Sequence, residues 1–65
     1  MDAATLAGLL REAEEQHGHY EPTAPAHHWS DWYAPFIVAR GSGRTSEEAY
    51  RDASAAVAAV LGESR

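Results

Sequence analysis

Histidines and carboxylates gather in the first half of this 65-residue chain, and these side chain types could support chemistry. The set comprises His17, His19, Glu21, His27, His28 and Asp31. Zinc and other borderline divalent metals bind imidazole nitrogens and carboxylate oxygens. If the intervening chain folds back on itself, a metal site could form from His17, His19, His27, His28 and Asp31. The chain lacks the His-x-x-x-His and His-Glu-x-x-His patterns, so ordinary polar or half-buried histidines are the alternative.

Asp31 has two interpretations. It stands near the expected start of a helix, where the free amides and the helix dipole stabilise a negative charge. Alternatively, a hydrogen bond to His27 or His28 would fix an imidazole tautomer, as a general base requires. No activated nucleophile is evident, because no triad context surrounds Ser30, Ser42 or Ser54. We therefore expect no catalytic residues.

The largest side chains lie in the run from His28 to Arg40, which contains both tryptophans and the only phenylalanine. Helical spacing places on one face Trp29, Trp32, Tyr33, Phe36, Ile37 and Arg40. This face could form a core, a partner interface or a pocket for a flat or cationic ligand. A chain this short buries only about 60% of its unfolded surface, so the rings should not all be enclosed. We expect a binding surface made of His28, Trp29, Asp31, Trp32, Tyr33, Phe36 and Arg40.

Apolar periodicity predicts the helices that position these residues. The first helix is expected at about 3–17, capped by Asp2 and ended by Gly18. Its apolar stripe continues through His17 and Tyr20, whereas Glu12 and its charged neighbours should form a solvated face. A connector follows over 19–28, extended by Pro22 and Pro25.

Two more helices complete the predicted domain. One is expected at about 30–40, ended by Gly41-Ser42-Gly43, although Pro35 would remove a hydrogen bond to the Asp31 carbonyl. The other is expected at about 46–61, begun by a capping box of Thr45 and Glu48 and ended by Gly62. The expected fold is all-α: one compact three-helix domain over 1–65, with a proline-containing connector between the first two helices.

Composition excludes several classes of function. Ten acidic residues against five basic ones give a net charge of -5, whereas nucleic-acid binding rewards clustered positive charge. Apolar runs fall far short of the roughly 20 residues of a membrane span, and Asp2 follows Met1 where an export signal would be basic. We expect a cytoplasmic protein that binds neither nucleic acid nor a membrane. Without cysteine, disulfides and thiolate metal ligands are excluded.

Three segments together share a pattern that covers nearly the whole chain. They are the helix containing Leu9 to Glu14, the run from His28 to Arg40, and the stretch from Gly43 to Ala49. The pattern resembles a small helical segment that accompanies some bacterial glyoxalase/bleomycin-resistance-type proteins. Pro35 departs from that pattern. Because no strand pattern is present, neither the metal ligands nor the drug binding of the βαβββ fold can be transferred. The resemblance implies an accessory helical module of bacterial origin.

We therefore expect a small non-catalytic binding or assembly module without a cofactor. Its aromatic surface would form a homo-oligomer or dock on a larger protein partner. The alternatives are a His/Asp site for a divalent metal such as zinc, supporting a hydrolytic or lyase-type reaction, and a small aromatic-ligand binding protein. Charging all four histidines would change the net charge from -5 to -1, so association should change between about pH 8 and 5.

Overall fold

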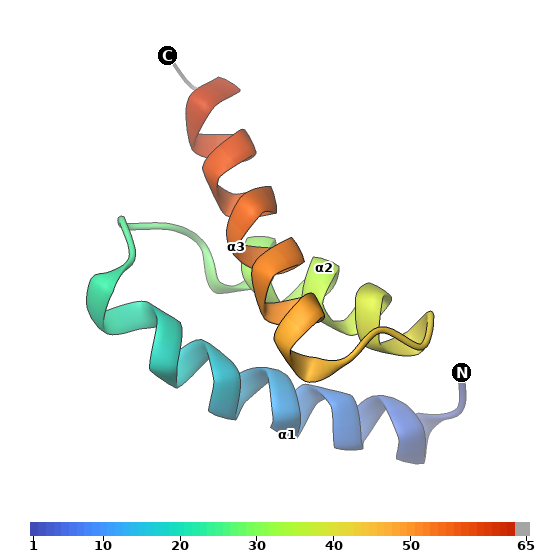
Figure 1. The fold of residues 1–65 in the computed structure, drawn as a ribbon. Coiled ribbons are helices and arrows are strands. Elements are labelled where there is room, and N and C mark those ends of the chain that lie inside the picture. Colours follow the sequence, from blue (N-terminus) through green and yellow to red (C-terminus); the bar gives the residue numbers. More distant parts are fainter. Residues whose placement is uncertain (64–65) are drawn as a thin grey trace.

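The computed structural model describes residues 1–63 as three helices (Figure 1). They are α1 (Ala3–Tyr20), α2 (Trp29–Gly41) and α3 (Ser46–Glu63), and a 3-10 turn, η1 (Glu21–Thr23), follows α1. The predicted all-α, three-helix architecture with its proline-containing connector is confirmed, but the extended conformation predicted for residues 19–23 is wrong, because these residues end α1 and form η1. Within this described part of the chain, no helix is long and apolar enough to cross a membrane.

The predicted caps of the first and third helices are confirmed. The Thr5 amide donates to the Asp2 carboxylate at 3.0 Å, and hydrogen bonds from Thr5 lower the pKa of Asp2. At the start of α3, the Glu48 amide donates to the Thr45 hydroxyl at 3.1 Å. The Thr45 amide donates in return to the Glu48 carboxylate at 3.0 Å, which completes the capping box.

Two predicted helix stops are wrong, because Gly18 and Gly62 lie inside helices. α1 continues through Gly18 to Tyr20 and passes directly into η1, while α3 continues through Gly62 to Glu63. Among residues 1–63, a positive φ occurs at Gly43, where it is 93° and the chain reverses between α2 and α3. A glycine permits a left-handed stop but does not require one.

α2 begins one residue earlier than predicted. His28 caps it, because its Nδ1 accepts a hydrogen bond from the Ser30 amide at 3.2 Å. Pro35 lies within the helix and, lacking an amide hydrogen, leaves the Asp31 carbonyl without the usual intrahelical donor. The Gly41-Ser42-Gly43 stop is confirmed as the end of this helix.

The core lies mainly between α2 and α3, which cross each other at an angle, with α1 beneath them (Figure 1). Its fully or nearly buried apolar residues are Ala13, Trp32, Phe36, Ala39, Ala49, Ala53 and Val57. Alanines on α3 leave room for the rings of α2, so large and small side chains alternate across the contact. The predicted pairing of an aromatic helix with an alanine-lined helix is confirmed.

Candidate functional site

The predicted aromatic surface is divided between the interior and the outside. Trp32 and Phe36 are 0% exposed, so their assignment to a binding surface is wrong. Trp29, three residues before Trp32 on the same helix, is 57% exposed. Helical spacing placed these rings on one broad face, but the neighbouring helices cover only part of that face.

Trp32 is enclosed by rings from all three helices. It stacks on Phe36 with ring centroids 5.0 Å apart and on Tyr20 of α1 at 5.7 Å. Tyr50 of α3 meets it edge-on at 5.6 Å. Its indole N–H donates to the Ser54 hydroxyl at 3.4 Å, so the one polar atom of this ring has a partner. Trp32 is therefore a structural residue.

Arg40, also predicted to bind a partner, joins the helices together. Its Nε donates to the Glu12 carboxylate of α1 at 2.9 Å, and its guanidinium also donates to the Arg44 carbonyl at 2.6 Å. Ser46 of α3 donates to the same Glu12 oxygen. Burial raises the pKa of Glu12, but the hydrogen bonds from Ser46 and Arg40 and the charge of Arg40 outweigh it and lower that pKa. The prediction that Glu12 is merely solvated is wrong.

Two exposed rings, His28 and Trp29, and the half-buried ring of Tyr33 form what we call the outer ridge. Trp29 stacks against His28 with centroids 5.7 Å apart and meets Tyr33 edge-on at 5.1 Å. Burial raises the pKa of Tyr33, and the negative charges of Glu14 and Glu21 raise it further. The ridge therefore borders a region of negative potential.

The predicted metal ligands are not assembled into one site. His17 and His27 meet, with their Nε2 atoms 2.9 Å apart, but the Nδ1 of His28 bonds to the Ser30 hydroxyl at 2.7 Å. His19 is exposed on α1. Across residues 1–63, no three His, Asp or Glu side chains are grouped so that they could hold a metal ion. The folded-back connector brings together two of the five predicted residues.

The second interpretation of Asp31, a hydrogen bond to an imidazole, is wrong. The Nδ1 of His27 lies 2.8 Å from the Pro25 carbonyl, and the Nδ1 of His28 is occupied by Ser30. Asp31 lies in the first turn of α2, as its other interpretation required. There its charge is favoured by the dipole of the helix.

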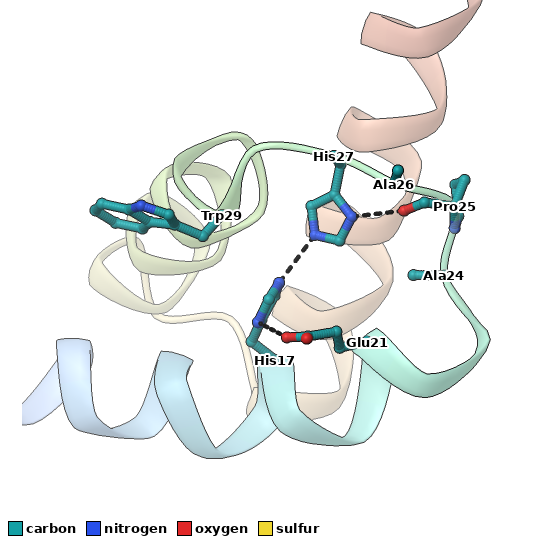
Figure 2. A pocket seen from close by; sticks show the side chains of 7 residues that line it. All are labelled: His17, Glu21, Ala24, Pro25, Ala26, His27 and Trp29. Atoms are coloured by element: carbon teal, nitrogen blue, oxygen red, sulfur yellow. Dashed lines mark hydrogen bonds and ion pairs between the residues drawn. The ribbon is translucent and has the colours of Figure 1, made fainter.

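A cleft of about 530 Å³ opens beside the two joined histidines (Figure 2). Its lining comprises His17, Glu21, Ala24, Pro25, Ala26, His27 and Trp29. His17 lies on α1, only 8% exposed, and its Nδ1 is 3.3 Å from the Glu21 carboxylate. The apolar stripe of α1 indicated that His17 faces inward. No sequence pattern indicated that His27 would meet it.

Comparisons of the chain with protein-family models, with curated proteins and with solved structures found no match. The resemblance to a helical segment of glyoxalase-type proteins therefore stays a prediction. The features of the molecule that bear on its function are the outer ridge and the cleft beside it.

Proposed function

We propose that the chain is a non-catalytic binding module that docks a partner protein on the outer ridge of α2. The exposure of Trp29 carries this proposal: a large ring is 57% open to solvent although neighbours hold it on two sides. Tryptophan is enriched among the few residues that dominate interface energetics. A ring held in place also loses little conformational entropy when it binds.

The charge around the ridge selects the kind of partner. Glu14 and Glu21 act on Tyr33, and the whole chain carries a net charge of -5. Two copies of so acidic a chain repel each other, which disfavours a second copy as the occupant. A partner segment with Lys or Arg beside an apolar side chain matches both the carboxylates and the indole face.

Site-specific photo-cross-linking tests this proposal. A photoreactive phenylalanine analogue replaces Trp29 in one variant and Val38 in another, in cells that naturally make the chain. Val38 is a matched control, since it is apolar, 68% exposed and also on α2. We expect a discrete adduct from position 29 and none of that mass from position 38. The cross-linked peptide of the partner should contain Lys or Arg.

Two results would overturn the proposal. Equal, diffuse adducts from both positions would show that the ridge has no preferred partner. An adduct of the chain with itself, matched by a dimer in sedimentation at micromolar concentration, would assign the ridge to self-association instead.

A further inference from the structure

The contact between His17 and His27 joins two segments of the chain, and the Tyr20 ring packs beside it with its centroid 5.3 Å from that of His27. His17 belongs to α1, and His27 belongs to the connector that leads into α2. Figure 2 shows a continuous series of contacts from Glu21 through both imidazoles to the Pro25 carbonyl. The arrangement links the end of α1 to the residue that immediately precedes the outer ridge.

The hydrogen positions in this series follow from its two ends. A carbonyl oxygen only accepts, so the Nδ1 of His27, 2.8 Å from the Pro25 oxygen, must carry the hydrogen. In neutral His27 the Nε2 is then an acceptor, and the Nε2 of His17 must donate to it across 2.9 Å. When His17 is charged, its Nδ1–H faces the Glu21 carboxylate at 3.3 Å.

The geometry fits a shared hydrogen better than a shared metal ion. The ring centroids are 5.1 Å apart and the Nε2 atoms 2.9 Å apart, so both nitrogens lie close to the line that joins the rings. A metal ion on that line would need about 2 Å to each nitrogen and would hold them about 4 Å apart. An N–H···N hydrogen bond accounts for the observed separation.

A second proton is incompatible with the contact. If both imidazoles are charged, both Nε2 atoms carry hydrogens, and two donors with like charges would face each other at 2.9 Å. The surrounding groups compensate only one positive charge. They are the Glu21 carboxylate from η1, the Pro25 carbonyl from the connector, and uncharged rings from α1 and α2, namely Tyr20, Trp32 and Tyr33.

We propose that the His17–His27 contact is an acid-sensitive latch that holds the connector against α1 and releases it when both imidazoles become charged. Imidazole is the side chain whose charge responds most readily to acid near neutral pH, so acid is the trigger for release. Because His27 precedes His28, the cap of α2 and a member of the outer ridge, release loosens one end of the ridge. The latch itself does not depend on the proposed docking function.

Histidine NMR and side-chain contacts test the latch in the full chain. At pH 7.5 we expect His27 as the Nδ1–H tautomer. As the pH is lowered from 7.5 to 5, we expect the nuclear Overhauser contacts between the Tyr20 ring and the side chain of residue 27, whose ring centroid lies 5.3 Å away, to be lost. His27→Gln should keep its contacts with Tyr20 at both pH values, because an amide oxygen can accept from His17 without titrating. The exposed His19→Gln serves as the matched control and should behave as the wild type.

Several results would overturn the latch. They are an Nε2–H tautomer of His27, contacts between Tyr20 and residue 27 that do not change with pH, or an equal loss of these contacts in His27→Gln. Loss of the pH response after treatment with a chelator would also overturn it, because a metal rather than a hydrogen would then join the rings.

Discussion

The two tryptophans of α2 are three residues apart in the sequence, but they differ in solvent exposure. Trp32 is completely enclosed between α1 and α3, whereas Trp29 is 57% exposed at the first turn of the helix. Their positions differ by only about 60° around a helix of 3.6 residues per turn. Whether a ring becomes core or surface is therefore decided by where the neighbouring helices lie, and not by the face of α2 alone.

Replacing the enclosed ring of Trp32 should have the largest effect on the free energy of unfolding. Trp32→Ala removes stacking on Phe36 and Tyr20 and leaves a cavity, at a cost of about 3–5 kcal/mol. A domain of this size has a total stability on the order of 5 kcal/mol, so urea denaturation should find the variant largely unfolded. Trp32→Phe, which keeps part of the ring volume, should be less destabilised. A loss below about 1 kcal/mol for Trp32→Ala would contradict the enclosed position.

Replacing Glu12, which contacts Arg40 and Ser46, should have an intermediate effect on the free energy of unfolding. Glu12→Gln weakens the contacts to Arg40 and Ser46, and because this site is partly exposed we expect a loss of about 1 kcal/mol at pH 7. The exposed Glu15→Gln on α1 is the control and should change stability little. Equal effects of the two substitutions, measured by urea denaturation, would show that Glu12 is an ordinary surface residue.

The contribution of Glu12 should respond to acid in a defined direction. The pKa of Glu12 is lowered in the folded chain, so its carboxylate contributes stability above its ordinary pKa of 4.5 and loses that contribution as pH falls through the folded value. The difference between the wild type and Glu12→Gln should thus be present at pH 7 and shrink below about pH 4.5. A difference that grows on acidification would contradict this sign.

Replacing the exposed ring should have the smallest effect on stability. Trp29→Ala removes contacts to His28 and Tyr33 at the surface, so the free energy of unfolding should change by no more than about 0.5 kcal/mol. Thermal and urea denaturation of Trp29→Ala and Val38→Ala should be nearly the same. A loss of about 2 kcal/mol in Trp29→Ala alone would place this ring in the core.

Local patterns were sufficient to predict the three helices. The Asp2 cap and the Thr45–Glu48 capping box depend on neighbours within three residues, and the core positions of α2 and α3 follow helical periodicity. The helix end predicted at Gly18 was wrong because a glycine is compatible with a helix when the residues around it pack well. His17 and Tyr20 lie on the buried side of that last turn.

The site could be predicted only in part, because its contacts join distant segments. Glu12 meets Arg40 and Ser46 only once the three helices are placed, and nothing within α1 indicates this. The meeting of His17 with His27 depends on the path of the connector, which two prolines restrict but do not determine. Trp29 was correctly assigned to a surface, whereas Trp32 was not.

Quenching of fluorescence in two single-tryptophan variants tests most directly whether Trp32 is buried and Trp29 is exposed. Trp32→Phe leaves Trp29 as the only indole, and Trp29→Phe leaves Trp32. We expect acrylamide to quench Trp29 strongly, with red-shifted emission, and to quench Trp32 weakly, with blue-shifted emission. Equal quenching of the two indoles, or stronger protection of Trp29, would contradict the division of α2 into an enclosed ring and an outer ridge.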